Sequence, residues 1–167
     1  MKNPHTYKSL LLWDGNLGEG TSTYAGYGRQ YRVVIDGKPD LHGTADPMFR
    51  GEAEKHNPED LFLAAVSSCH MLSYLALCAR GSINVVSYRD DASGDLALEG
   101  GGGRFTEIRL HPVVTVADAR DVDRARALHE KAHELCFIAN SSSVPIRHEA
   151  VVLVEGMLVE EAGKSEG

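Results

Sequence analysis

The chain has three cysteines whose chemistry depends on where the fold places them: Cys69, Cys78 and Cys136. A cysteine thiolate is a nucleophile that can be oxidised to a sulfenic acid, and a second thiol can condense with that product to a disulfide. A free cysteine is, however, among the most buried residue types and often only fills a core. A cysteine alone is therefore no proof of a functional site. The residues around each cysteine indicate whether it is reactive or only fills the core.

Cys69 and Cys78 are nine residues apart in one apolar stretch that we predict to be a helix. At about 100° per residue they lie on opposite faces of that helix, so they cannot share one site. We interpret Cys78 as a core residue. Cys136 belongs to a second predicted helix, and only the tertiary fold could bring it to Cys69.

The eight histidines are scattered, and only His129 and His133 have the i, i+4 spacing that can bind a metal on a helix. A third ligand is not evident, so we predict exposed helix histidines and no metal site. His70 follows Cys69 directly, but adjacent helix residues diverge by about 100° and His70 cannot act as the base for its neighbour. A Cys/His hydrolase is therefore disfavoured.

The clearest element in the sequence is a helix that starts at Asn57-Pro58-Glu59-Asp60. Asn57 can cap it, proline suits its first position, and the two acidic residues face the positive end of the helix dipole. Residues 61–80 are apolar or small on all sides, which predicts a helix buried all round that Gly81 ends. Polar side chains interrupt the apolar stretch, so we predict a core helix and no membrane span.

The remaining elements alternate between strands and a second helix. We expect hairpin turns at Asp36-Gly37 and at the four glycines 100–103, an irregular loop over 41–56, and a frayed tail over 160–167. Strands are predicted at 7–13, 21–27, 30–35, 83–88, 95–98, 105–116 and 151–159, and the second helix at 121–137. This order predicts an α+β fold with antiparallel sheets around a long buried central helix, as a single domain over residues 1–167.

Composition limits the function classes. The net charge is −7 and no basic cluster occurs, which argues against nucleic-acid binding, so we predict no nucleic-acid partner. No signal peptide is evident, and three cysteines without an export signal indicate a reducing, cytoplasmic compartment where structural disulfides are not expected. One small sheet cannot cover a helix that is apolar on every face. A second subunit could, so we predict a homodimer.

Two motifs carry a family resemblance. The run 57–61, Ala64-Ala65 and Cys69, ten residues after Glu59, resembles the OsmC/Ohr family of osmotically inducible protein C and organic hydroperoxide resistance proteins. The end of the second helix, 132–136, with Ala139-Asn140-Ser141, is similar to that family's second cysteine motif. Trp13-Asp14-Gly15-Asn16 and Cys69-His70-Met71 favour the OsmC-like branch, and the resemblance covers nearly the whole chain.

The resemblance implies a thiol-dependent peroxidase that reduces organic hydroperoxides, and also hydrogen peroxide. It implies an intertwined homodimer with active sites at the subunit interface. Cys69 would attack the O–O bond, Cys136 would close a disulfide, and an external thiol or dithiol would reduce it, without any cofactor. The alternative is a non-catalytic module of the same fold that binds an apolar small molecule at the dimer interface.

A thiol in an apolar helix needs a cation beside it to ionise. The family uses an arginine held by the glutamate that Glu59 matches, and Arg50 in Phe49-Arg50-Gly51 fits the arginine of OsmC-type members, with Arg29 in reserve. Ten residues of unbroken helix separate Glu59 from Cys69 by about 15 Å. We therefore predict that Glu59 and Arg50 serve the Cys69 of the other subunit.

Overall fold

A computed structural model describes residues 5–156. The predicted tail over 160–167 and the end of the predicted last strand, 157–159, lie outside this range. The chain divides into two compact units, Met1–Phe62 and Leu63–Gly167, and each is described by itself. The prediction of a single domain stays a prediction.

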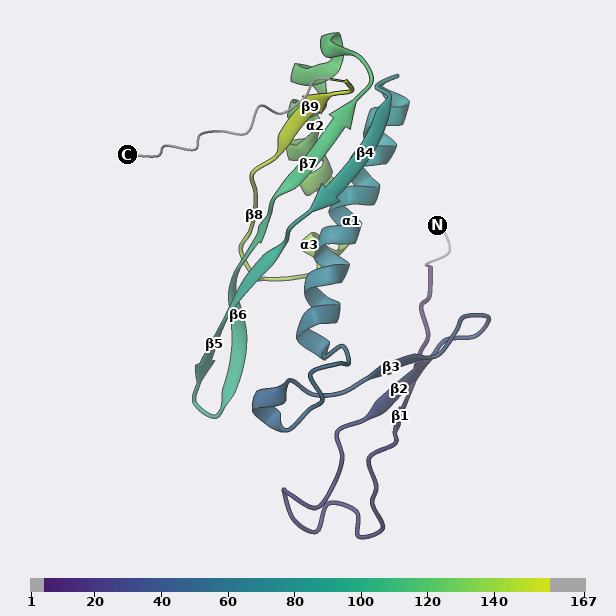
Figure 1. Cartoon of the computed structure of the whole chain (residues 1–167), viewed down its shortest axis with the longest axis vertical. Helices are drawn as coiled ribbons and strands as arrows, with labels where there is room; N and C mark the ends of the chain where they lie inside the picture. The colour runs from purple at the N-terminus through teal and green to yellow at the C-terminus, as the bar shows by residue number, and fades with distance from the viewer. Residues whose placement is uncertain (1–4, 157–167) are drawn as a thin grey trace. The chain divides into compact units, whose positions relative to one another are not determined.

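The first unit contains one antiparallel sheet of three strands, in the order β1, β2, β3 (Figure 1). Its elements are β1 (Leu10–Trp13), β2 (Tyr31–Val34), β3 (Leu41–Gly43) and the short helix η1 (Pro47–Phe49). The turn between β2 and β3 forms as predicted: Gly37 adopts a φ of 73°, the left-handed region that favours glycine. β3 and η1 occupy a segment that we predicted to be an irregular loop, because they are too short to give a periodic pattern.

The strand predicted over residues 21–27 is wrong, because this segment consists of turns and bends. Its tyrosines and threonines favour a strand, but local hydrogen bonds compete with sheet pairing. The guanidinium of Arg29 donates to the backbone carbonyls of Tyr24, at 2.7 Å, and Tyr27. The Asn16 side chain accepts from two glycine N–H groups.

Helix α1 spans Pro58–Arg80, as the sequence predicted. The Asp60 N–H donates to the Asn57 side-chain oxygen at 2.8 Å, so Asn57 caps the helix. At the other end the Ile83 N–H donates to the Cys78 carbonyl at 2.9 Å. Gly81 follows the last helical residue as expected, but the left-handed residue is Ser82, with a φ of 57°.

Within one chain, α1 is not buried all round. Its buried side chains are four, in a single stripe with four-residue spacing: Val66, His70, Tyr74 and Cys78. By length and composition alone the helix could cross a membrane. The stripe includes polar side chains that pack against other elements of the second unit. The other side chains of α1 are half-buried or exposed, and a second subunit would cover them in our homodimer prediction.

The second unit contains two sheets of three strands, in the orders β4-β7-β9 and β5-β6-β8. β4 pairs with β7 and β5 with β6 in the antiparallel sense, whereas β6–β8 and β7–β9 are parallel. The prediction of purely antiparallel sheets is therefore wrong for the C-terminal strands, while the α+β class is confirmed. The strands are β4 (Val85–Asp90), β5 (Ser93–Glu99), β6 (Gly102–Leu110), β7 (Pro112–Val116), β8 (Ile146–His148) and β9 (Val151–Val154).

The single strand predicted over 105–116 divides at His111 into β6 and β7, which belong to different sheets. Proline at position 112 has no N–H to donate to a ladder. The His111 N–H donates instead to the Asp90 carboxylate at 2.7 Å. The glycines 100–103 lie at the β5–β6 hairpin end, as predicted, with Gly100 and Gly101 at positive φ.

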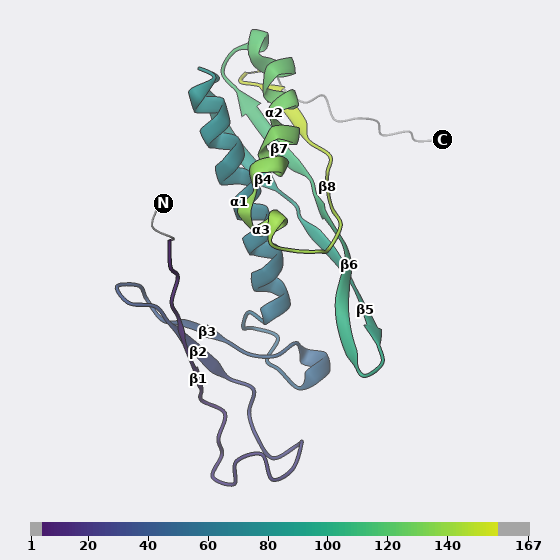
Figure 2. The ribbon, with the colours of Figure 1, turned by 180° about the vertical axis from the view of Figure 1, so that it is seen from behind.

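Helices α1 and α2 (Val122–Leu135) cover one face of the β4–β7–β9 sheet (Figures 1 and 2). The core between them includes Cys78, 1% exposed, which confirms its interpretation as a core residue. The second helix ends earlier than predicted. Cys136 separates α2 from the one-turn helix α3 (Phe137–Asn140).

Candidate functional site

The two candidate thiols belong to the second unit and come from different elements. Cys69 lies on α1 and is partly exposed, whereas Cys136 is 1% exposed. Cys136 has an extended backbone, with φ −70° and ψ 110°, so it interrupts the helical path between α2 and α3. Its sulfur accepts a hydrogen bond from the Ala139 N–H at 3.4 Å. The break fixes the direction of this side chain.

The Cys136 thiol is a neighbour of the Cys69 thiol, and the two groups interact. Burial is the main cause that raises the pKa of Cys136 to about 11; the Ala139 N–H opposes that shift, and the neighbouring Cys69 adds to it. Cys136 is therefore protonated at neutral pH. The fold brings together the two cysteines that the sequence could not connect.

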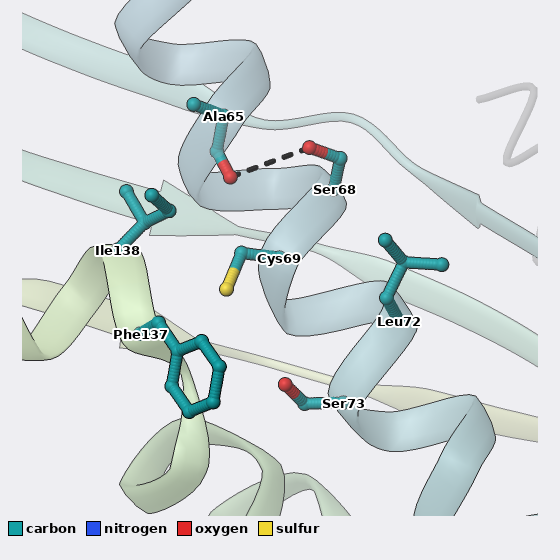
Figure 3. A pocket seen from close by; sticks show the side chains of 7 residues that line it. All are labelled: Ala65, Ser68, Cys69, Leu72, Ser73, Phe137 and Ile138. Atoms are coloured by element: carbon teal, nitrogen blue, oxygen red, sulfur yellow. Dashed lines mark hydrogen bonds between the residues drawn. The ribbon is translucent and has the colours of Figure 1, made fainter. Parts of the chain in front are cut away.

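An open pocket of about 470 Å³ lies over Cys69 (Figure 3). Its wall is mostly apolar, and the Cys69 sulfur points toward the segment that carries Phe137 and Ile138. Phe137 is 78% exposed, so a large aromatic ring borders the opening. The lining residues are Ala65, Ser68, Cys69, Leu72, Ser73, Phe137 and Ile138. A small molecule with an apolar body could reach the thiol here.

Arg50 and Glu59 lie in the first unit. Arg50 is exposed and follows η1 in the left-handed conformation, with a φ of 68°. Glu59 is half-buried in the first turn of α1. Burial, and then the charges of Glu59 and Asp60, raise the pKa of Tyr31. Within residues 5–156 the Arg50 and Glu59 side chains form no ion pair with each other, so the pairing that the resemblance implies is not made in one chain.

Arg29, the reserve arginine, is occupied locally. Its guanidinium lies over the ring of Tyr27, at 3.9 Å from the centroid, and over Tyr24, at 4.6 Å. It also donates to the carbonyls of both tyrosines. A cation held by two rings and two carbonyls is poorly placed to serve a thiolate elsewhere.

The family model for the OsmC-like protein matches residues 51–149, which is more than half of the chain and includes both cysteines. The chain belongs to the OsmC-like protein family. The resemblance seen in the sequence is thereby confirmed. A comparison with curated proteins gives no match.

Solved structures agree with this assignment. An OsmC-like protein of unknown function from Vibrio cholerae is 28% identical, with a TM-score of 0.79 over 89% of this chain and 100% of that one. An organic hydroperoxide resistance protein from Elizabethkingia anophelis is 22% identical, with a TM-score of 0.66 over 92% and 99%. The organic hydroperoxide resistance protein OhrB of Bacillus subtilis is 21% identical, with a TM-score of 0.59 over 88% and 98%. The last two share the fold with this OsmC-like chain.

Beside the thiols, this OsmC-like protein has a histidine cluster that the sequence did not reveal. His129 is 1% exposed, so the prediction of an exposed histidine is wrong there. His70 Nε2 and His129 Nδ1 are 3.1 Å apart and the ring planes differ by 10°. Burial is the main cause that lowers the pKa of His70 to about 4 and of His129 to about 3, and neighbouring histidines contribute. Both rings are therefore neutral at pH 7.

His148 and His133 extend the cluster. The His148 ring centroid lies 5.4 Å from that of His70 and 5.7 Å from that of His133. Within residues 5–156, no three His, Cys, Asp or Glu side chains are arranged to hold a metal ion. Because the His70 ring faces His129, it is directed away from Cys69, as helical phase predicted.

The sequence analysis did not predict the residues that line the pocket around Cys69, although helical spacing indicates some of them. Ala65, Leu72 and Ser73 lie at i−4, i+3 and i+4 from Cys69 and share its helix face. Phe137 and Ile138 follow Cys136 directly. Their role as the opposite wall depends on the break after α2, which no periodic pattern indicated.

Proposed function

We propose that this OsmC-family protein is a thiol-dependent peroxidase that reduces organic hydroperoxides, and hydrogen peroxide as a smaller substrate. The observation that carries the proposal is the contact between a partly exposed thiol, Cys69, and a buried thiol, Cys136, beside an apolar pocket. The apolar wall suits the alkyl group of an organic hydroperoxide. Hydroperoxide resistance proteins with the same fold support this substrate class.

The chemistry has three balanced steps. The Cys69 thiolate attacks the terminal peroxide oxygen, the O–O bond breaks, and the alkoxide takes a proton to become an alcohol. Cys69 is then a sulfenic acid, with which the Cys136 thiol condenses, releasing water and forming the Cys69–Cys136 disulfide. Two electrons from an external thiol or dithiol restore both thiols. These steps need no metal or organic cofactor, and they suit a reducing cytoplasm.

Cys136 is suited to the second step rather than the first. A thiol with a pKa of about 11 is almost entirely protonated at pH 7. Because it is the thiolate form that attacks a peroxide, Cys136 stays reduced during the first step, and it is held where a sulfenic acid would form. In this proposal the unequal burial of the two cysteines gives them different roles: Cys69 attacks the peroxide, and Cys136 closes the disulfide.

The direct test is stopped-flow mixing of the pre-reduced protein with cumene hydroperoxide. A rapid burst of one peroxide reduced per chain is expected. Cys69→Ser should abolish it, whereas Cys78→Ala, which alters a core thiol outside the pocket, should keep it. No burst with any hydroperoxide would overturn the proposal.

We also propose that Arg50 stabilises the Cys69 thiolate of a second subunit in a homodimer, and that Glu59 pairs with the guanidinium once the dimer has formed. The exposed apolar Leu72 side chain on α1 supports a second subunit, and the Arg50 side chain has no ion pair within residues 5–156. Complementation tests it: Cys69→Ser and Arg50→Ala chains, each inactive alone, are unfolded together and refolded. Mixed dimers regain activity only if Arg50 acts across the interface. Activity in a monomeric fraction would contradict it.

The second candidate is a non-catalytic module that binds an apolar small molecule, and the open apolar pocket favours it. Iodoacetamide alkylation at pH 7 separates the two functions. The peroxidase should show Cys69 modified faster than a free cysteine and Cys136 at least about 100-fold slower than one, in line with its raised pKa. Ordinary reactivity of both thiols would favour the binding module.

A further inference from the structure

The pocket over Cys69 contains two hydroxyl groups in an otherwise apolar wall, and they differ in one respect. The Ser68 hydroxyl donates back to the Ala65 carbonyl at 3.3 Å (Figure 3). The Ser73 hydroxyl makes no hydrogen bond within residues 5–156. Its hydrogen is therefore available to a molecule in the pocket, whereas that of Ser68 is already used.

Ser73 is also well placed relative to the thiol. It lies four residues after Cys69, so both side chains project from one face of α1 about one turn apart. Figure 3 shows the Cys69 sulfur and the Ser73 oxygen on the same side of the helix, with Phe137 opposite. A small molecule between the helix and Phe137 could touch both.

We propose that Ser73 is a substrate-binding residue that donates a hydrogen bond to the alkyl-bearing oxygen of an organic hydroperoxide attacked by Cys69. The inference rests on the proposed peroxidase function. As the new S–O bond forms and the O–O bond breaks, the electron pair moves to the alkyl-bearing oxygen, which becomes an alkoxide. Ser73 stabilises that charge, and water supplies the proton that completes the alcohol.

The effect should be large because the surrounding wall is apolar. A hydrogen bond to a charged oxygen is stronger than one between neutral groups, and little in this wall competes for the charge. Loss of the hydroxyl should therefore slow attack by about 10- to 100-fold. The alkyl group, held by Leu72 and Phe137, should bind about as before, so the loss appears mainly in the rate of attack at saturating peroxide.

The experiment compares four pre-reduced proteins with cumene hydroperoxide in stopped flow: wild type, Ser73→Ala, Ser73→Thr and Ser87→Ala, which removes an exposed hydroxyl on β4 outside the pocket. Ser73→Ala should slow sulfenic acid formation by about 10- to 100-fold, Ser73→Thr should recover most of that loss, and Ser87→Ala should stay within about twofold. Alkylation of Cys69 by iodoacetamide, which has no oxygen leaving group, should be unchanged in all four.

Two outcomes would overturn the inference while the peroxidase proposal stands: equal rates for Ser73→Ala and wild type, or a parallel loss of peroxide reduction and alkylation. The second would mean that Ser73 supports the thiol or the fold. A wild-type protein without any burst would instead remove the proposed function, and this inference with it. Thermal melts of each variant show whether the comparison is made on folded protein.

Discussion

Cys69 and His70 are neighbours on α1, yet they belong to surfaces with opposite properties. Cys69 opens into a pocket of about 470 Å³, and His70 is 1% exposed beneath the helix. On the face of α1 that carries Cys69 (the thiol surface), the Ser73 hydroxyl has no partner among the described residues but is accessible. His70 lies on another face of α1 and packs against histidines of other elements, and we call this group the histidine surface. Three of its ring nitrogens, on His70, His129 and His133, are buried without a hydrogen bond to any described residue.

The difference shows how one helix separates reactivity from packing. A rotation of about 100° per residue is enough to place adjacent side chains on different surfaces. The thiol surface keeps polar groups where a small molecule can use them. The histidine surface keeps them in a low-polarity environment, where the neutral form is favoured and stability depends on protonation. The first surface should respond to mutation in rate, and the second in stability.

The largest effect is expected on the thiol surface, from Cys136→Ser. The first attack by Cys69 should persist, but the disulfide cannot form, so turnover with a dithiol should fall by at least about 100-fold because a held neighbouring thiol is lost. Dimedone trapping with mass spectrometry should detect a lasting sulfenic acid on Cys69. Unchanged turnover would show that Cys136 is not the resolving thiol.

A fall in pH should lower the stability of the fold through the buried histidines of the histidine surface. The folded-state pKa values of His70 and His129, about 4 and 3, lie below the ordinary value of 6.5. The unfolded chain therefore binds more protons than the folded one below pH 6.5. Stability is full above that pH and falls as the pH drops toward 4, by up to about 1.4 kcal/mol per pH unit for each histidine. Urea unfolding at pH 7, 6, 5 and 4 measures the slope.

Groups on every neighbouring element bear on this slope: Tyr74 on α1, His133 and Glu130 on α2, and His148 on β8. The double variant His70→Leu/His129→Leu isolates the share of the buried pair, because carboxylates elsewhere titrate equally in both proteins. Its slope between pH 6.5 and 4 should be shallower than that of wild type. An identical slope in the two proteins would show that His70 and His129 are not the source of the loss of stability in acid.

A smaller effect is expected from His129→Leu alone at pH 7. The substitution leaves His70 Nε2 buried without its partner at 3.1 Å, which should lower the free energy of unfolding by about 1–3 kcal/mol. The peroxide burst of the folded variant should stay within about twofold of wild type. Chemical denaturation and stopped flow on one preparation measure the free energy of unfolding and the peroxide burst. Loss of the burst with unchanged stability would contradict the prediction that the histidine surface affects stability and not rate.

Much of this division was predictable from sequence. The cap at Asn57, the helix over 58–80 and the opposite faces of Cys69 and Cys78 depend on local chemistry and helical period, which a sequence records. The family resemblance indicated the pair of cysteines. The strand over 21–27 failed because hydrogen bonds from Arg29 outweigh β propensity there.

The histidine cluster could not be predicted, because it joins three elements. His70 comes from α1, His129 and His133 from α2, and His148 from β8, whose parallel pairing with β6 had no sequence signal. A similar limit applies to Cys136, since its contact with Cys69 depends on an extended residue between two helices. Contacts between elements distant in sequence are set by tertiary packing and not by local pattern.

The smallest effect is expected at the edge of the histidine surface, from Glu130→Gln. Glu130 lies 3.4 Å from His148 Nε2, but its side chain is 73% exposed, so water screens the pair. The free energy of unfolding should change by less than about 0.5 kcal/mol at pH 7. Urea denaturation at that pH checks this. A loss comparable to that of His129→Leu would mean that the stabilising contacts extend to the solvent-exposed end of the cluster, and that the buried His70–His129 pair is not their centre.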